Sequence, residues 1–389
     1  MNTHFRLAEL SLQLKRWPAH CDFPNLQAWD AVDELLLTKA FECIQAEKPT
    51  HVLLLNDQFG AISCALLASH PELIIWHYTD SRVSQLACQH NLAANHLDSS
   101  HVHFFSSIVP CPAQPDLVLM RIPRVHGYVH YQLQQLAQAI TKQTQLLIAA
   151  KAKDIHKNLL QLFSDTLGPT TASLTIKKCR LLHCHPTWPL AKSMQRWPKQ
   201  WPVPEQGVQL FNHANVFSSE KLDIGARFFL THLPDTSPAQ TLIDLGCGNG
   251  ILGLSALLAN PQLRVIFCDE SYMAVESARL AVTENAPHLL EQCTFRVDDA
   301  LTEQGDKSVD WILCNPPFHQ QQTITTHLAT QMFSDARRTL KPGGYLRIVA
   351  NRHLPYGQQL KRIFSGCRCL ASQAKFIILE SQLRSNSCD

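Results

Sequence analysis

Apolar and polar positions in the second half of the chain alternate between short strand-like runs and longer amphipathic stretches. The run Thr241-Leu-Ile-Asp-Leu245 is followed by a cluster of glycines and then by residues with helical spacing. The same alternation recurs further along. It predicts strands at residues 241–245, 264–268, 293–297, 309–314 and 345–350, and helices near 253–258, 271–285 and 328–340. Strands that alternate with helices of this length indicate an α/β fold, with a parallel sheet covered by helices on both faces.

The first half of the chain repeats this order. Its pattern predicts a helix at 84–95 and strands at 51–55, 73–78, 116–120 and 145–150. A shift of 190 residues places Val52-Leu-Leu-Leu-Asn56 on Leu242-Ile-Asp-Leu-Gly246, and Asn95 on Asn285. An internal duplication accounts for this match. Two unrelated doubly wound domains are the alternative.

A segment rich in proline and tryptophan separates the halves. Residues 186–204 hold five prolines and three tryptophans, which is incompatible with a regular helix. We therefore predict a linker or an irregular docking segment at 186–207, between domains at 1–205 and 206–389.

The composition is that of a globular protein, with 45% hydrophobic and 17% charged residues. No apolar run approaches the ~18 residues of a membrane span, and the first residues show no secretory signal, so we expect a cytoplasmic monomer without a membrane partner. The 14 cysteines are then expected to be reduced thiols. We predict no metal site, because no second ligand pair accompanies His101-Val-His103, His183-Cys-His185 or Cys367-Arg-Cys369.

A glycine loop, Asp244-Leu-Gly-Cys-Gly-Asn-Gly250, follows the first strand of the second half. Glycines at this point permit positive φ angles and let a ligand approach the backbone closely. A dinucleotide-binding loop would carry glycine where Ile251 stands. The spacing therefore favours a loop that binds S-adenosylmethionine, although a glycine turn of this kind can also be purely structural.

Acidic residues follow the next two strands. Asp269 comes about 20 residues after the loop, where a carboxylate accepts hydrogen bonds from both ribose hydroxyls of a nucleoside. The alternative role for Asp269 is to cap the helix that begins near Ser271. Asp299 is expected to bind the adenine amine, and its alternative is an ordinary surface acid.

The most specific signal is Asn315-Pro-Pro-Phe318, directly after the fourth strand. An amine conjugated to a heteroaromatic ring is a poor nucleophile because its lone pair is delocalised. The Asn315 side-chain oxygen and the Pro316 carbonyl can accept both of its N–H bonds and direct the lone pair at a methyl donor. Pro317 helps to fix this backbone, and Phe318 offers a face on which a flipped base can stack. The motif thus predicts methyl transfer to an amine.

These motifs together resemble the ribosomal RNA large subunit methyltransferase G family, and the resemblance extends over nearly the whole chain. In the second half it rests on His213-Ala-Asn-Val-Phe-Ser218, Leu222-Asp-Ile-Gly-Ala-Arg-Phe228, Asn315-Pro-Pro-Phe-His-Gln320 and Val349-Ala-Asn-Arg-His-Leu354. In the first half it rests on Leu26-Gln-Ala-Trp29, Asn56-Asp-Gln-Phe-Gly-Ala61, Ala150-Lys-Ala-Lys-Asp-Ile-His156 and Leu167-Gly-Pro-Thr170.

The resemblance implies two tandem Rossmann-like class I methyltransferase domains, of which the N-terminal copy is degenerate. It implies S-adenosylmethionine-dependent methylation of a guanine N2, at guanine 1835 of 23S rRNA, with naked or early-assembly rRNA as the partner. The implied catalytic residues are Asn315, Pro316, Pro317 and Phe318. The implied cofactor-binding residues are Phe217, Ser218, Asp223, Asp244, Gly246, Cys247, Gly248, Gly250, Asp269, Asp299 and Asn315.

Four other functions fit part of this signal. The related small-subunit family methylates guanine N2 in 16S rRNA and shares the duplicated plan. Protein-glutamine and DNA-adenine methyltransferases use an Asn-Pro-Pro-aromatic clamp that usually ends in tyrosine. A catalytically silent RNA-binding assembly factor is the non-enzymatic alternative, but the intact motifs of the second half count against it.

The first half has lost these motifs and has gained positive charge. Asn56-Asp-Gln replaces the first two glycines of the loop, and Arg121-Ile-Pro-Arg124 stands where the second half has the Asn-Pro-Pro-Phe motif. Between residues 121 and 204 there are 12 basic residues and two acids, although the whole chain has a net charge of only +2. We predict that this region binds rRNA phosphates. The residues assigned to it are Arg121, Arg124, Lys151, Lys153, Lys177, Lys178 and Arg180.

Overall fold

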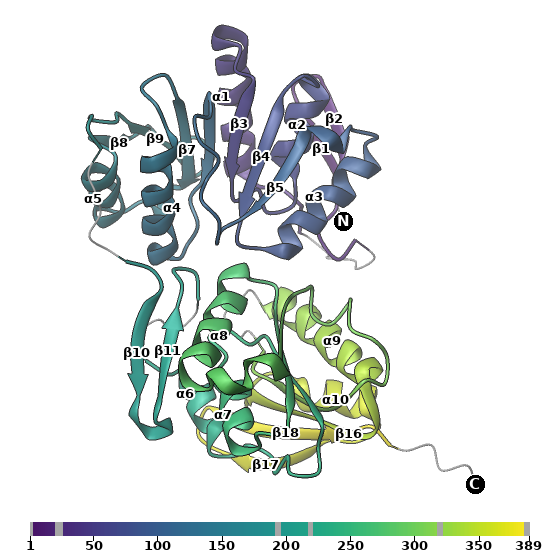
Figure 1. Ribbon diagram of the computed structural model, residues 1–389. Coiled ribbons are helices and arrows are strands. Elements are labelled where there is room, and N and C mark those ends of the chain that lie inside the picture. The colour runs from purple at the N-terminus through teal and green to yellow at the C-terminus, as the bar shows by residue number, and fades with distance from the viewer. Residues whose placement is uncertain (1–2, 20–25, 191–195, 217–220, 317–321, 385–389) are drawn as a thin grey trace. The chain divides into compact units, whose positions relative to one another are not determined.

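The chain folds into two compact units, Met1–Trp197 and Pro198–Asp389 (Figure 1). The computed structural model describes residues 3–19, 26–190, 196–216, 221–316 and 322–384, with the side chains of 322–326 left out. Each unit is an α/β sandwich around one seven-stranded sheet, accompanied by a two-stranded antiparallel hairpin.

The sheet of the second unit has the strand order β14-β13-β12-β15-β16-β18-β17. Its first five strands are parallel, β18 runs antiparallel to them, and β17 at the edge pairs antiparallel with β18. The strands are β12 (Thr241–Leu245), β13 (Arg264–Asp269), β14 (Cys293–Val297), β15 (Val309–Cys314), β16 (Leu340–Asn351), β17 (Arg368–Ser372) and β18 (Phe376–Gln382). The chain order reverses between β12 and β15, and crevices for ligands form at such switch points in open α/β sheets.

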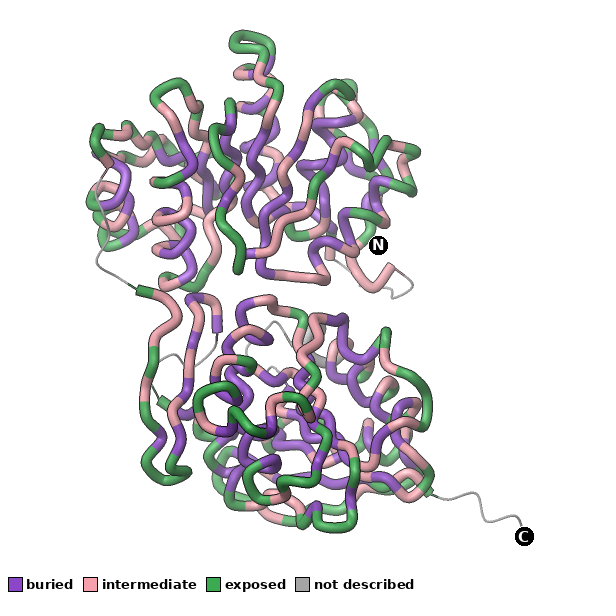
Figure 2. The backbone as a smooth tube through the Cα atoms, viewed as in Figure 1, coloured by how far each residue is buried: buried purple, intermediate pink, exposed green. Residues whose placement is uncertain are grey.

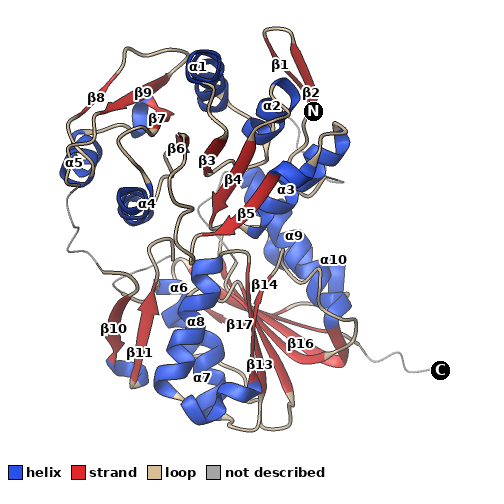
Figure 3. Cartoon of the chain, turned by 45° about the horizontal axis from the view of Figure 1, so that its top comes forward, coloured by secondary structure: helices blue, strands red, loops and turns tan. Residues whose placement is uncertain are grey.

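Helices cover both faces of this sheet and enclose a separate apolar core on each side (Figure 3). One core contains Phe229, Leu254 and Val282, from α6 (Ile224–Leu230), α7 (Ile251–Ala259) and α8 (Tyr272–Asn285). The other contains Phe333 and Leu360, from α9 (Gln322–Thr339) and α10 (Tyr356–Phe364). The hairpin β10 (Lys199–Val203) and β11 (Val208–Asn212) packs on α8.

The first unit has the equivalent order β5-β4-β3-β6-β7-β9-β8, with the same strand directions. Its strands are β3 (His51–Leu55), β4 (Ile74–Thr79), β5 (Val102–Ser106), β6 (Leu117–Arg121), β7 (Gln145–Lys151), β8 (Thr170–Ala172) and β9 (Cys179–Cys184). Its helices are α1 (Ala31–Glu47), α2 (Ala61–Ser69), α3 (Arg82–Ala94), α4 (His126–Ala139) and α5 (Lys157–Thr166), and its hairpin is β1 (His4–Leu7) and β2 (Leu10–Gln13).

Equivalent side chains hold equivalent elements together in the two units. Asn95 accepts a hydrogen bond from the Gln13 amide and donates one to the Gln13 carbonyl, both of 2.8 Å. Asn285 makes the same pair of bonds with Gln209, of 2.8 and 2.7 Å. Each asparagine therefore ties its hairpin to the end of the helix that follows the second strand of the sheet. Shared bonds of this kind support an internal duplication.

The structure differs from the expected pattern in two places. The sheets are mixed rather than parallel, because the strand next to one edge, β18 or β9, runs antiparallel to both of its neighbours. Lys199–Val203, which we placed in a linker, is a strand of the second unit. It pairs with β11, and the Trp201 indole N–H donates to Asn212 Oδ1 over 2.8 Å. Pairing with a neighbouring strand gives this proline-rich segment a regular structure that its own sequence does not favour.

Burial follows the sheets in both units (Figure 2). The strands β3, β6, β12 and β15 are almost completely covered, as expected for parallel strands with helices on both faces. Every cysteine that the structure describes is a free thiol. In the same described part of the chain, no helix is long and apolar enough to cross a membrane.

We predict that Asn285→Ala destabilises the attachment of the hairpin in the second unit. The substitution removes three hydrogen bonds, to both backbone groups of Gln209 and to the Ala281 carbonyl. Each is worth about 1 kcal/mol net, so the free energy of opening should fall by about 1–3 kcal/mol. Hydrogen exchange of the Gln209 amide measures this. Glu284→Ala, at an exposed neighbouring position on α8, is the control, and equal exchange rates in both variants would contradict the assignment.

Candidate functional site

The predicted cofactor loop lies at the switch point of the second sheet, between β12 and α7. The amides of Gly246 and Cys247 both donate to the Cys268 carbonyl, over 2.8 and 3.0 Å, which fastens the loop to β13. Gly246, Gly248 and Gly250 have φ angles of 69°, 54° and 80°, in the left-handed region that glycine adopts without strain. The loop geometry is therefore the one that the glycine spacing predicts.

Two of these glycines serve different purposes. A Cβ at Gly250 would lie 2.8 Å from Ala278 Cβ, so this glycine allows close packing of the loop on α8. A Cβ at Gly248 would meet no described atom within 4 Å. Gly248 thus presents bare backbone to open space, and such a surface fits the close approach of a cofactor.

Asp244 shapes the loop from within β12. Its carboxylate is buried and accepts a 2.8 Å hydrogen bond from the Gly253 amide, in the first turn of α7. Burial raises the pKa of Asp244 to about 7, and the nearby Asp269 charge adds to this effect. The carboxyl group therefore titrates near neutral pH, in a place where a bound cation would stabilise its ionised form.

Asp269 and Asp299 lie next to this loop. Asp269 accepts hydrogen bonds of 3.0 Å from the amides of Gly248 and Ser271, so it connects the glycine loop to the start of α8. The Asp298 amide donates to the Asp269 carbonyl, which sets the neighbouring Asp299, a buried side chain, beside it. The helix cap itself is Ser271, which accepts from the Ala274 amide. Burial raises the pKa of Asp269.

Asn315 is next to the glycine loop, at the end of β15. A Cβ built on Gly246 would lie 3.9 Å from the Asn315 carbonyl oxygen. The Asn315 side-chain oxygen is buried and has no hydrogen-bond donor among the described residues. Buried acceptors are usually satisfied, so this oxygen has the property expected of a group that binds the amine of a substrate.

Four of the predicted site residues lie outside the described residues, namely Phe217, Ser218, Pro317 and Phe318. Pro316 is described and buried. Asp223 is also described, and its carboxylate accepts from the Ala226 amide at the start of α6.

In the first unit, side chains of the chain itself occupy the corresponding loop. Asn56 replaces Gly246 and has a similar φ of 67°. Its amide group bonds to the Arg121 carbonyl and to Gln132. Asp57 accepts from the Ser63 amide over 2.9 Å, and Ser63 is the counterpart of Gly253. The amide that Asp244 binds in the second unit is thus bound here by a carboxylate from within the loop.

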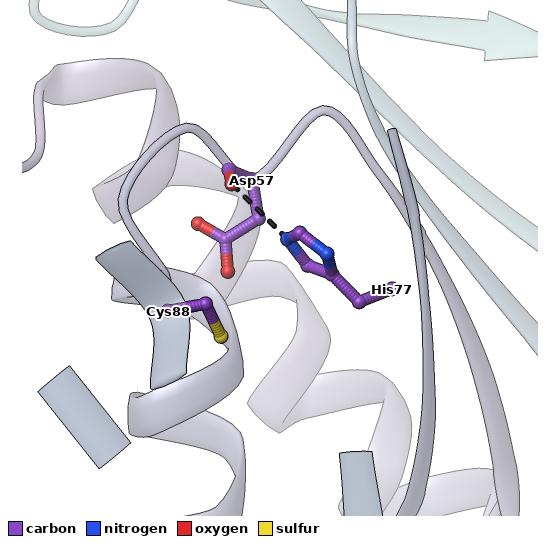
Figure 4. A group of neighbouring side chains, drawn as sticks. All are labelled: Asp57, His77 and Cys88. Atoms are coloured by element: carbon purple, nitrogen blue, oxygen red, sulfur yellow. Dashed lines mark hydrogen bonds between the residues drawn. The ribbon is translucent and has the colours of Figure 1, made fainter. Parts of the chain in front are cut away.

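Asp57 also belongs to a buried group with His77 and Cys88 (Figure 4). The potential metal ligands of the three residues lie within 4.8 Å of one another. However, His77 Nε2 donates to the Asp57 carbonyl, and the Asp57 carboxylate is bound by the amide and hydroxyl of Ser63. Burial raises the pKa of the Cys88 thiol, which disfavours the thiolate that a metal requires. We interpret the group as packing that fills the former cofactor loop.

Arg121 requires a correction to the predicted RNA-binding set. Its guanidinium is buried and binds Asp30 and Asp33, with contacts of 2.7 Å to each. Although burial opposes it, the bond to Arg121 holds the pKa of Asp30 well below its usual range. Arg121 is therefore neutralised inside the fold and is not placed to contact phosphate. Asp30 and Asp33 are spaced as a capping box, which marks the start of α1 but does not indicate Arg121 as their partner.

Five of the other six predicted basic residues lie along two adjacent segments of the first unit, and Arg124 lies after β6. The Ala152 amide donates to the Lys178 carbonyl, so residues 151–153 run beside 177–180. Lys151 and Lys177 pair with Asp30 and Glu34, and Arg180 donates to the carbonyls of Ser173 and Ala172. Arg124, Lys153 and Lys178 are exposed and form no side-chain hydrogen bond or ion pair with the described residues.

Comparison with known proteins gives a consistent result for both units. Residues 2–188 match the RLMG N-terminal domain, and residues 207–380 match the methyltransferase small domain. Proteins named ribosomal RNA large subunit methyltransferase G are similar over nearly their full length. That of Pectobacterium atrosepticum is 45% identical and covers 99% of both chains, and that of Klebsiella pneumoniae is 46% identical over 95% of both.

A solved structure has the same two-unit fold. The T. thermophilus 16S rRNA N2 G1207 methyltransferase, in complex with AdoMet and guanosine, matches 98% of both chains with a TM-score of 0.72 and 21% identity. The matching fold agrees with two class I methyltransferase domains in tandem. The chain therefore belongs to the ribosomal RNA large subunit methyltransferase G family and is an S-adenosylmethionine-dependent methyltransferase that acts on ribosomal RNA.

Proposed function

We propose that the second unit methylates the exocyclic N2 amine of a guanine in 23S rRNA, and that guanine 1835 is its target. The observation that carries this proposal is the buried side-chain oxygen of Asn315, an acceptor without a described donor in a residue whose backbone lies next to the glycine loop. A guanine N2 amine offers two N–H donors, which suit this oxygen and the Pro316 carbonyl. Protein-free or early-assembly 23S rRNA, a cytoplasmic site of action and a monomeric enzyme complete the proposal.

The residues of the chain contribute mainly orientation. S-adenosylmethionine supplies an electrophilic methyl group on a sulfonium. Asn315 and Pro316 accept the two amine hydrogens, which takes the nitrogen lone pair out of conjugation with the ring and directs it at the methyl group. No base is needed, because the methylated ammonium is strongly acidic and loses its proton to water or a nearby carbonyl. Alignment of this kind provides effective molarities of about 10⁵ M or more.

Several residues are suited to hold the cofactor. Gly246 and Gly248 offer bare backbone, and Asp269 has lone pairs left after accepting two amide bonds. Asp299 is the proposed acceptor for the adenine amine. Asp244 contributes negative charge near a cofactor that carries a sulfonium and an ammonium group.

We propose that the first unit captures the rRNA through its exposed basic residues. Arg124, Lys153 and Lys178 are the main candidates. Lys151, Lys177 and Arg180 belong to the same surface, although each already contacts another group of the first unit. Arg121 is excluded because it forms ion pairs inside the fold.

The first prediction concerns Asn315. We expect Asn315→Ala to lower methyl transfer by at least about 100-fold, because the amine loses an acceptor that orients it, while the dissociation constant for S-adenosylmethionine stays unchanged. Transfer of tritiated methyl groups and calorimetry measure the two quantities. Asn158→Ala, an exposed position on α5, is the control.

The substrates for this assay are protein-free 23S rRNA, assembled 50S subunits, DNA and release-factor protein. Label on 23S rRNA is the expected result. Label only on DNA or protein would contradict the proposed substrate, and loss of cofactor binding in Asn315→Ala would contradict the role of this side chain.

The second prediction concerns pH. The pKa of Asp244 is about 7 in the free protein, and the positive charge of the cofactor should lower it. Binding then releases a proton, so affinity is highest above pH 7 and weakens as the pH falls, by up to about tenfold per unit. Calorimetry in buffers of different ionisation enthalpy measures the released proton.

Asp244→Asn keeps an acceptor for the Gly253 amide and should remove this proton release. Asp235→Asn, at an exposed position of the same unit, should leave it intact. A pH-independent affinity between pH 6 and 8 in the wild type would refute the assignment to Asp244.

The third prediction concerns RNA capture. The double variant Lys153→Glu, Lys178→Glu should weaken rRNA binding and reduce the slope of log K against log salt concentration by about 0.7 for each lost single-strand phosphate contact. Lys142→Glu is the matched control, because Lys142 is exposed before β7 whereas Lys153 follows that strand. Filter binding at several salt concentrations tests this. Equal slopes for the double variant and the control would show that the surface does not bind RNA.

A further inference from the structure

The two units share one further pair of side chains, Asp30 and Asp223, which lie 193 residues apart. Each precedes the first helix of its unit, and each carboxylate accepts from an amide in the first turn. When the two sequences are aligned with a shift of 193 residues, the buried positions of α6 coincide with buried positions of α1. The helices also pack on equivalent strands, α1 on β7 and β9 and α6 on β16 and β18. Asp30 and Asp223 therefore occupy equivalent places.

Strand register gives a second correspondence. Met120 pairs with Leu55, and Cys314 pairs with Leu245, at the same position relative to the central strand of each sheet. The next residues along the chain, Arg121 and Asn315, are therefore equivalent. In the first unit, Asp30 binds the side chain of Arg121. By equivalence, Asp223 in the second unit faces the position next to the Asn315 side chain.

In the first unit, that aspartate binds a fork of N–H donors. Asp30 Oδ1 accepts from Arg121 Nη1, and Oδ2 accepts from Nη2, both over 2.7 Å. Oδ1 also accepts from the Val32 amide over 2.9 Å. One carboxylate can therefore cap its helix and hold a planar pair of N–H groups at the same time.

The second unit keeps the carboxylate but has no guanidinium at this position. Asn315 stands in place of Arg121, and its side-chain oxygen has no described donor. Ala226 stands in place of Asp33, the second carboxylate that binds Arg121 in the first unit. The second unit therefore has a carboxylate and an amide oxygen where the first unit has a bound guanidinium.

Guanine carries the same arrangement of donors as a guanidinium, because its N1–H and N2–H groups are joined through C2. Adenine has an unprotonated N1 at the corresponding position, which a carboxylate would repel. We propose that the Asp223 carboxylate accepts the N1–H of the target base, while Asn315 and Pro316 accept the N2 hydrogens. Asp223, which the family resemblance assigned to the cofactor, is then a specificity-determining residue for guanine. This inference rests on the proposed guanine-N2 activity.

The test compares two versions of an rRNA fragment that spans the methylated base, one with guanine and one with 2-aminopurine at that position. 2-Aminopurine keeps the N2 amine, but its N1 carries no hydrogen. The wild-type enzyme should prefer guanine in kcat/KM, and Asp223→Asn should reduce this preference by about 10- to 100-fold, the discrimination expected of a specific hydrogen bond. Asparagine is as good a helix cap as aspartate, and its amide can donate to the unprotonated N1.

Two further variants sharpen the result. Asp223→Ser keeps a cap but has no group that reaches the base, so the preference should fall without favouring 2-aminopurine. Asp235→Asn should behave as the wild type. The affinity of Asp223→Asn for S-adenosylmethionine, measured by calorimetry, should remain within about threefold of the wild type.

An unchanged preference in Asp223→Asn would overturn the inference. An equal loss of activity on both RNAs, accompanied by weaker cofactor binding, would also overturn it and would place Asp223 in the cofactor pocket instead. A wild-type enzyme that methylates neither RNA would contradict the proposed function, whereas guanine methylation without a role for Asp223 would contradict only this inference.

Discussion

The hydrogen bond between the Asp244 carboxylate and the Gly253 amide is the interaction on which the second unit depends. It joins the end of β12 to the first turn of α7 across the glycine loop, so it fixes the loop on which the cofactor site is built. The same bond places a buried carboxyl group at the switch point of the sheet, where its pKa rises to about 7. Burial causes this rise, whereas the bond from the Gly253 amide stabilises the ionised carboxylate and lowers the pKa.

In the first unit, a carboxylate from a different position accepts from the equivalent amide. The loss of the cofactor loop in this unit follows from that difference. Leu54 stands in place of Asp244, and Asp57 binds the Ser63 amide from inside the loop. With Asn56 also bonded to Arg121 and Gln132, the loop is occupied by its own side chains. The fold is thereby preserved without a cofactor.

The sequence predicted most elements because both units follow strong local rules. The predicted strands at 51–55, 241–245 and 309–314 have the observed bounds, since apolar runs in a buried parallel sheet are easy to recognise. Arg121 shows the limit of this reasoning. The excess of basic residues in the sequence assigns Arg121 to an RNA-binding surface. In the structure, two acids that lie 88 and 91 residues earlier in the chain bind Arg121 inside the fold. Pairing over that distance leaves no local signal.

The sequence by itself determined the fold class, the duplication and the family, because glycine spacing, strand periodicity and the Asn-Pro-Pro-Phe motif are local features. Only the tertiary structure decided which charges are available, that Lys199–Val203 is a strand, and that the Asn315 side-chain oxygen is buried in a residue whose backbone lies next to Gly246. It also revealed that Asp30 and Asp223 are equivalent. The role of each depends on the residue at the end of a distant strand, which is Arg121 in the first unit and Asn315 in the second. Such neighbours are set by packing and strand register, which the order of residues along a single chain does not display.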